Sequence, residues 1–193
     1  QAARRENNFG LYAPYLEKLV DMAKQKADFY SYSTHPYDAL LNEFEPGMNT
    51  QFLDPLFLNL RVAIVDLLKK IRARQGKSVF KSLPGIYEEE KQREFGIKVL
   101  EQMGFDFKRG RQDKSTHPFM TDIHATDVRI TTRYSLTHVM EGLSSSMHEG
   151  GHGLYEQGLD PAWSGTPFGS SASLAVHESQ SRFWENVIGK RES

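Results

Sequence analysis

The segment His148-Glu149-Gly150-Gly151-His152 decides how the rest of this chain is interpreted. It matches the pattern HExxH, in which two histidines stand four positions apart. Residues at that spacing on an α-helix project from one face, so both imidazoles can hold one metal ion. Glu149 flanks that face, from which its carboxylate can take a proton from metal-bound water. The segment therefore predicts a zinc-type catalytic site, with His148 and His152 as ligands and Glu149 as the base.

The helix around this motif is predicted from an apolar stripe at three- and four-residue steps over about residues 136–156. The stripe consists of Leu136, Val139, Met140, Leu143, Met147, Gly151 and Leu154. Two adjacent glycines inside a helix should cost roughly 1 kcal/mol each. We expect the close approach of another backbone across the site to offset that cost.

A catalytic zinc needs a third protein ligand and one open position. Glu156 follows His152 by one turn of the same helix and would have to curl back, whereas Asp160 in the next loop stays open as a ligand. Glu178 fits best, because a long loop allows its helix to fold back antiparallel and face the two imidazoles. His177 lies about 100° around that helix from Glu178, which favours a packing or hydrogen-bonding role. The full set of downstream candidates is Glu156, Asp160, His177, Glu178 and Glu185.

Most of the remaining chain has helical periodicity, which predicts helices over about residues 15–30, 55–74, 88–103 and 171–190. Residues 31–51 are rich in His, Pro, Asp, Asn and Gly, so we expect a long irregular connection there. Residues 127–134 alternate β-branched and charged side chains, with Val128, Ile130 and Thr132 on one face, which predicts a strand. The expected fold is mainly α, with a small β-sheet beside the metal cleft.

The composition excludes several classes of protein. The chain has no cysteine, which rules out disulfides, thiolate metal sites and a cysteine nucleophile and is compatible with a reducing cytoplasm. Lys and Arg number 24 and Asp and Glu 25, so the net charge of -1 gives no indication of nucleic acid or an anionic membrane surface. The sequence has no run of about 18 apolar residues, so it predicts no membrane span.

Three further motifs accompany HExxH. His117-Pro118-Phe119 and Asp127-Val128-Arg129-Ile130-Thr131 precede it, and His177-Glu178-Ser179-Gln180 follows it, with 30 positions between His148 and Glu178. In this order and with these intervals, the chain resembles the carboxypeptidase Taq family of metallocarboxypeptidases over about residues 117–186. Before residue 117 the resemblance rests on helical character alone.

The resemblance implies a helical zinc-peptidase fold in a homodimer of subunits of about 500 residues. It also implies broad removal of C-terminal amino acids, except Pro, from peptide substrates in the cytoplasm. By the same resemblance, His148, His152 and Glu178 bind Zn²⁺ or Co²⁺, Glu149 is the base, and His117 and Arg129 line the substrate groove. From the residues alone, Arg129 and Arg133 could bind a substrate carboxylate or form salt bridges beside the cleft.

The family's later motifs IRxxAD and GxxQDxHW are absent from these 193 residues. We therefore expect one partial domain, with residues 1–103 as a helical wall and residues 104–193 as the sheet and the metal-binding helices. Alone, this stretch should bind zinc, cleave C-terminal residues negligibly and expose apolar surface around Phe183, Trp184, Val187 and Ile188. A metallo-endopeptidase or oligopeptidase with the same metal core, or a catalytically inactive metal-binding fragment, are the alternatives.

Overall fold

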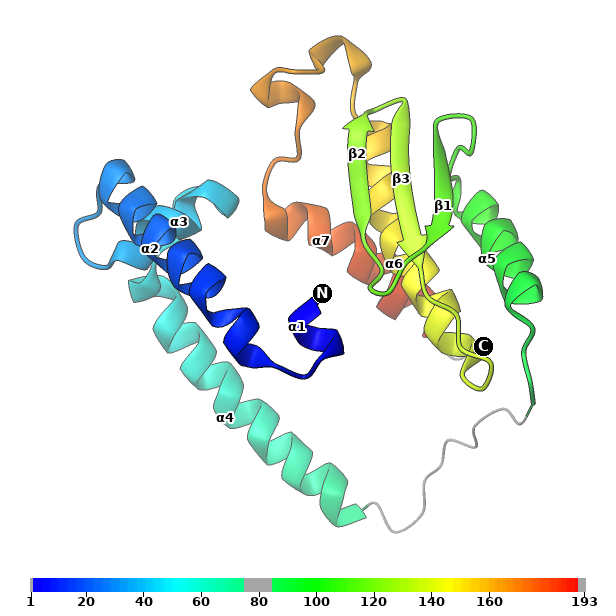
Figure 1. Ribbon diagram of the computed structural model, residues 1–193, viewed down its shortest axis with the longest axis horizontal. Helices are drawn as coiled ribbons and strands as arrows, with labels where there is room; N and C mark the ends of the chain where they lie inside the picture. Colours follow the sequence, from blue (N-terminus) through cyan, green and yellow to red (C-terminus); the bar gives the residue numbers. More distant parts are fainter. Residues whose placement is uncertain (1, 75–84, 191–193) are drawn as a thin grey trace. The chain divides into compact units, whose positions relative to one another are not determined.

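The structure, a computed structural model, describes residues 2–74 and 85–190. The chain divides into two compact units, residues 1–77 and 78–193, and each is described by itself. The first unit is helical (Figure 1). Its elements are α1 (Ala2–Arg5), the 3-10 turn η1 (Phe9–Leu11), α2 (Ala13–Tyr30), α3 (Pro36–Phe44) and α4 (Thr50–Arg74).

Residues 31–51 contain α3, so the prediction of a long irregular connection there is wrong. Pro36 occupies the first turn of α3, where its missing N–H costs no helical hydrogen bond. The Nδ1 atom of His35 caps the helix by accepting a hydrogen bond from the Tyr37 N–H at 3.1 Å. The His and Pro that were interpreted as loop residues therefore begin a helix. Similarly, α4 begins at Thr50 rather than 55, since Asn49 Oδ1 accepts a hydrogen bond from the Phe52 N–H.

The second unit combines helices with a three-stranded sheet, which confirms the mainly α fold with a small sheet (Figure 1). The strands are β1 (Gly110–Lys114), β2 (Met120–His124) and β3 (Asp127–Thr132), in the order β1-β3-β2. β1 runs parallel to β3, and β2 runs antiparallel to it. Val128, Ile130 and Thr132 are fully buried, so the predicted strand has its expected inner face.

The helices of the second unit are α5 (Glu89–Met103), α6 (Val139–Gly158) and α7 (Leu174–Arg182). The predicted terminus of α5 is confirmed, because Gly104 follows it with a φ of 99° in the left-handed region. The short turns η2 (Pro161–Trp163) and η3 (Pro167–Gly169) lie between α6 and α7. α7 continues directly into a π-helix, η4 (Phe183–Ile188), where the sequence predicts a single α-helix.

Leu100 and Met103 of α5 join the hydrophobic core of the second unit. The other buried members of this core are Phe105, Val128, Ile130 and Met147. α5 therefore groups with the sheet, α6 and α7, whereas the sequence predicts a helical wall that ends at residue 103. Trp184 also packs against this core, while Phe183, Val187 and Ile188 are exposed as expected.

The buried face of α6 consists mainly of small residues. Leu136 and Met140, which the apolar stripe places in the interior, are 56% and 49% exposed. The face toward α5 and the sheet instead carries Gly142, Ser146, Gly150 and Gly153. A Cβ at Gly150 would lie 2.3 Å from Leu100 Cδ2, and one at Gly153 would lie 2.7 Å from Phe105 Cε2. Small residues thus allow α5 and the sheet to pack directly on the backbone of α6.

Gly151 faces α7. A Cβ at this position would lie 2.7 Å from Ser181 Cα and 2.8 Å from the Gln180 carbonyl oxygen. Both of these atoms belong to the backbone of α7, so the expected close approach of a second backbone is confirmed. α6 thereby packs against the sheet on one side and against α7 on another (Figure 1).

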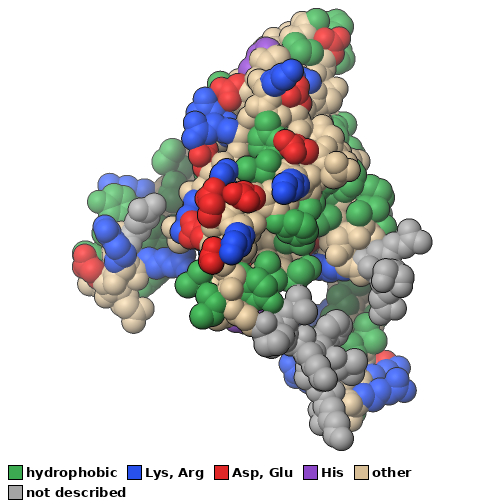
Figure 2. Space-filling view, turned by 90° about the vertical axis from the view of Figure 1, so that its right-hand side faces the viewer, with side chains coloured by type: hydrophobic (Ala, Val, Ile, Leu, Met, Phe, Trp, Pro, Cys, Tyr) green, Lys and Arg blue, Asp and Glu red, His purple; other side chains and the backbone are tan. Residues whose placement is uncertain are grey.

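The outer side of α5 is covered by charged side chains of both signs. Glu90 pairs with Arg93, and Glu89 pairs with Lys114 of β1 at 2.6 Å. Figure 2 looks onto this side of the second unit and shows acidic and basic groups next to each other. No helix among the described residues is long and apolar enough to cross a membrane.

Substituting Gly151 by Ala should destabilise the second unit. The new methyl group would meet backbone atoms that can only move if α6 and α7 separate, which typically costs about 1–3 kcal/mol. Denaturant unfolding of the zinc-free protein measures this loss. The matched control is Gly158→Ala, since among the described residues no atom beyond its own stretch of helix lies within 4 Å of its added Cβ. Equal losses in both variants would contradict the packing argument.

Candidate metal centre

Three side chains from two helices converge on one point. His148 and His152 extend from α6, and Glu178 extends from α7. Glu178 Oε2 lies 3.1 Å from His152 Nε2 and 3.7 Å from His148 Nε2. Within residues 2–74 and 85–190, this is the one group of three potential ligands whose donor atoms lie within 4.8 Å of one another.

The geometry of this group fits zinc. Tetrahedral zinc with bonds of about 2.0–2.2 Å separates neighbouring donor atoms by roughly 3.3–3.6 Å. The separations of 3.1 and 3.7 Å in the structure lie on either side of that range. Two imidazole nitrogens and one carboxylate oxygen are a ligand set of catalytic zinc sites, in which the fourth position stays open.

The other candidates for the third ligand are engaged elsewhere. Asp160 caps η2 by accepting a hydrogen bond from the Ala162 N–H at 2.9 Å. Glu156 Oε1 lies 2.9 Å from His177 Nε2, and His177 Nδ1 lies 2.9 Å from His152 Nδ1. Glu185 Oε2 lies 3.0 Å from His148 Nδ1. Glu156, His177 and Glu185 therefore stand behind the converging atoms rather than among them.

Glu178 is held by its own helix. Arg182 Nε donates to Glu178 Oε1 at 2.7 Å, and Ser181 Oγ donates to Oε2 at 2.9 Å. Burial acts to raise the pKa of the Glu178 carboxyl, but these two hydrogen bonds and the charges of His148 and Arg182 together lower it. Glu178 is consequently a carboxylate at neutral pH, as a metal ligand must be.

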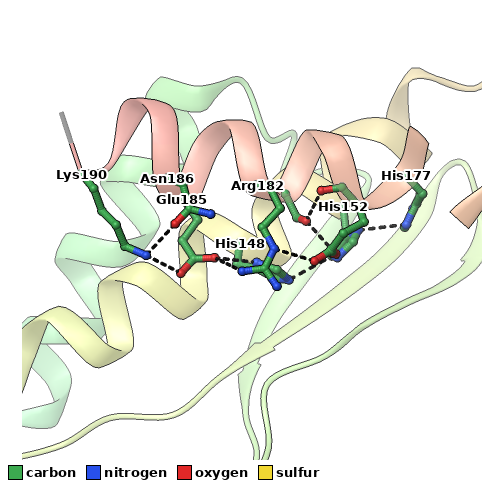
Figure 3. Close-up of polar contacts among 9 residues, drawn as sticks. His148, His152, His177, Arg182, Glu185, Asn186 and Lys190 are labelled. Atoms are coloured by element: carbon green, nitrogen blue, oxygen red, sulfur yellow. Dashed lines mark hydrogen bonds and ion pairs between the residues drawn. The ribbon is translucent and has the colours of Figure 1, made fainter. Parts of the chain in front are cut away.

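Glu185, one of the candidate third ligands in the sequence, contacts His148, the first histidine of the motif. Its Oε1 accepts a hydrogen bond from Lys190 Nζ at 3.0 Å, while its Oε2 faces His148 Nδ1 (Figure 3). Burial acts to raise the pKa of Glu185, and the hydrogen bonds with Lys190 and His148 lower it overall. The contacts of Ser181 and Arg182 were not predicted, although Arg182 stands four positions after Glu178, the spacing of an ion pair on a helix.

Glu149 is buried at the edge of an open cleft beside the ligands. The cleft has a volume of about 490 Å³, and its lining includes His117, His148, Glu149 and Glu185. Burial is the main cause that raises the pKa of the Glu149 carboxyl, and the charges of Glu178 and Glu185 add to it. A raised pKa makes a carboxylate a better proton acceptor. The site therefore combines a ligand set, a buried base and an open face.

Arg129 and Arg133, the two candidate cations for a substrate carboxylate, are ion-paired in the structure. Arg129 Nε donates to Asp127 Oδ1 at 2.9 Å, and its second nitrogen donates to Oδ2 at 2.8 Å. Arg133 pairs with Glu141, a residue of the cleft lining. His117 lies on the cleft, whereas Arg129 is not among the residues that line it. The assignment of His117 and Arg129 to substrate binding stays a prediction.

Comparisons with known proteins point to one family. The family model described as carboxypeptidase Taq (M32) metallopeptidase matches residues 1–193. The chain is 41% identical over 190 residues to carboxypeptidase 1 of Bacillus subtilis (strain 168), covering 98% of this chain and 38% of that protein. It is 39% identical over 199 residues to thermostable carboxypeptidase 1 of Thermus thermophilus, covering 98% and 39%.

Solved structures agree as well. A crystal structure of BsuCP matches with a TM-score of 0.91 at 41% identity, over 98% of this chain and 38% of the other. The M32 carboxypeptidase from Deinococcus radiodurans R1 matches with a TM-score of 0.85 at 43% identity, over the same shares. The chain thus spans about two fifths of the length of the relatives that it matches.

Mutating an outer-sphere partner of a metal ligand typically lowers the metal affinity 10- to 100-fold. Glu178→Gln changes a proposed direct ligand, so it should weaken zinc binding by more than that. A neutral amide is a poor zinc ligand, while the size of the side chain is kept. Competition with a chelator measures the zinc Kd of the metal-free protein. Asp160→Asn serves as the control. If Asp160→Asn releases zinc and Glu178→Gln does not, Asp160 is the third ligand.

In the zinc-free protein, His152 should make the free energy of unfolding fall as the pH falls from about 6.5 to about 4. Burial, followed by the nearby charges of His177 and His148, lowers the pKa of His152 from 6.5 to about 4. Between these values the unfolded state binds the proton and the folded state does not, so the unfolded state is favoured. The full effect is about 3 kcal/mol. Denaturant unfolding at several pH values should show that the free energy of unfolding depends less on pH in His152→Asn than in the unaltered protein. An unchanged pH dependence would contradict this prediction.

Proposed function

Because the chain belongs to the carboxypeptidase Taq (M32) metallopeptidase family, we propose that it forms the metal-binding part of a metallocarboxypeptidase that releases C-terminal amino acids from peptides with broad specificity. The observation that carries this proposal is the convergence of His148, His152 and Glu178 inside a chain that the family model matches throughout. The chain spans 38% of its Bacillus relative, so activity and substrates are proposed for the complete protein.

The resident ion in this proposal is Zn²⁺, with Co²⁺ as a second possibility. The nitrogen and oxygen ligands suit either ion, because imidazole and carboxylate bind several divalent metals. When bound, the ion supplies Lewis acidity, which lowers the pKa of water and polarises a peptide carbonyl. His148 and His152 are held to this task by contacts at their Nδ1 atoms, which leave both Nε2 atoms free for the metal.

In the proposed mechanism Glu149 is the general base that takes a proton from the attacking water. Three observations support this role. Glu149 follows His148 directly on α6, it lines the same cleft as His148, and its pKa is raised by burial. A group with a raised pKa can accept the proton and later deliver it to the leaving amine.

The substrate groove is proposed to use His117 and Arg129. The position of His117 on the cleft beside His148 and Glu149 supports its part. Arg129 would have to exchange its pairing with Asp127 for a carboxylate of the peptide, as an exposed ion pair can at little cost. The proposal of a cytoplasmic homodimer rests on the family resemblance alone.

A metallo-endopeptidase or oligopeptidase with the same metal core is the competing function. A carboxypeptidase must recognise a free terminal carboxylate, and an endopeptidase does not. Hydrolysis by the complete protein of a blocked dipeptide with a free carboxylate, compared with its C-terminal amide, separates the two. Cleavage of both at similar rates would favour the endopeptidase, and cleavage of neither by the zinc-loaded protein would indicate an inactive metal-binding protein.

Glu149→Gln in the complete protein should keep zinc bound and lower turnover about 100- to 10,000-fold. The reason is that Gln cannot accept the proton, while the three ligands are unchanged. Steady-state hydrolysis and zinc content are measured on the same preparations. Glu101→Gln on the exposed side of α5 is the matched control. A near-normal rate would exclude Glu149 as the base, and loss of zinc would indicate that it supports the ligands.

A further inference from the structure

Behind His152, on the side away from Glu178, lies a second buried pair of titratable side chains. His177 Nδ1 lies 2.9 Å from His152 Nδ1, and the two rings are nearly parallel with centroids 4.5 Å apart (Figure 3). His177 Nε2 lies 2.9 Å from Glu156 Oε1, but the two atoms do not form a hydrogen bond. The side chains of His177 and Glu156 are only 12% and 10% exposed.

The contacts of His152 determine where the protons of this group lie. His152 presents Nε2 to Glu178, so a metal bound there leaves the single proton of the neutral ring on Nδ1. The Nδ1–H then donates to His177 Nδ1, which must be the unprotonated nitrogen of its own ring. The proton of His177 therefore lies on Nε2, which faces the carboxylate of Glu156. This arrangement of protons satisfies the Nδ1 contact between the two rings and places the Nε2–H of His177 close to the Glu156 carboxylate.

We propose that His177 is a positioning residue, which holds His152 in the orientation and tautomer that bind the metal, and that Glu156 anchors His177. This rests on the metal centre proposed above, but not on its activity. Ligand histidines commonly donate their second N–H to a carboxylate, which fixes the ring. His148 follows that pattern directly through Glu185, whereas His152 reaches its carboxylate through a second imidazole.

The arrangement also joins the two metal-binding helices. His152 and Glu156 belong to α6 and lie one turn apart, while His177 belongs to α7 directly before the ligand Glu178. The ring of Tyr155 meets the edge of His177 with centroids 5.2 Å apart, which closes the group from another side. A rotation of His177 would consequently disturb the ligand on α6 without moving the ligand on α7.

The variants His177→Asn and His177→Leu test this role, because they differ in hydrogen bonding but little in shape. The Asn side chain offers an oxygen near the position of His177 Nδ1, and Leu offers none. We expect His177→Leu to raise the zinc Kd about 10- to 100-fold and His177→Asn to restore most of the affinity. His138→Ala, an exposed histidine before α6, is the control and should leave the zinc Kd unchanged.

Zinc competition and the visible absorption of the Co²⁺-loaded protein are measured on variants whose circular dichroism is unchanged. A shifted cobalt spectrum in His177→Leu, returned by His177→Asn, supports positioning through the Nδ1 contact. The proposal would be overturned if both variants bound zinc as tightly as the unaltered protein. It would also be overturned if both variants lost the same affinity or both failed to fold, because either result would indicate that His177 serves packing alone. If the unaltered protein itself binds no zinc, the proposed metal centre fails instead.

Discussion

The close contact between the backbones of α6 and α7 at Gly151 is the constraint on which the site depends. The two histidines of HExxH lie on one helix, so their mutual placement is set locally. The proposed third ligand, Glu178, belongs to another helix, and its distance from the imidazoles is set by how closely the helices pack. Because Gly151 has no side chain, Ser181 of α7 lies directly on α6. Glu178 stands three positions before Ser181 on α7, so its carboxylate reaches His152.

Each proposed ligand also contacts a second side chain that orients it, and the kind of contact differs among the three. His148 has a carboxylate behind it, His152 has an imidazole that faces a carboxylate, and Glu178 has a guanidinium and a hydroxyl. The partners come mostly from α7 and η4, so the helix that brings one ligand also orients the other two. Such outer contacts determine the direction of a donor atom as much as the main chain does. Arg182 contacts both Glu178 and Glu185, and Lys190 pairs with Glu185, which limits the repulsion between these two carboxylates.

Sequence reasoning reached the parts of this structure that depend on spacing. HExxH and the 30-position interval to Glu178 predicted the ligand group that the structure brings together, and alternation predicted β3. The sequence-based prediction of buried residues failed where the buried side chains are not hydrophobic. The inner face of α6 carries Gly142, Ser146, Gly150 and Gly153, which no apolar pattern marks. The helix α3 was missed because Pro36 was interpreted as a breaker although it stands in a first turn. The change of α7 into a π-helix has no signal in single-residue propensity.

The glycines of α6 have a consequence for how the second unit folds. With Gly142, Gly150, Gly151 and Gly153 inside it, this segment has a low intrinsic helicity, since each glycine costs about 1 kcal/mol relative to Ala. Isolated helices of this length are marginal in water even for good helix formers. The segment therefore gains its helical order only together with α5, the sheet and α7. An unfolded or partly folded chain has no preformed pair of imidazoles to capture a metal ion, and metal capture is coupled to completion of the tertiary structure.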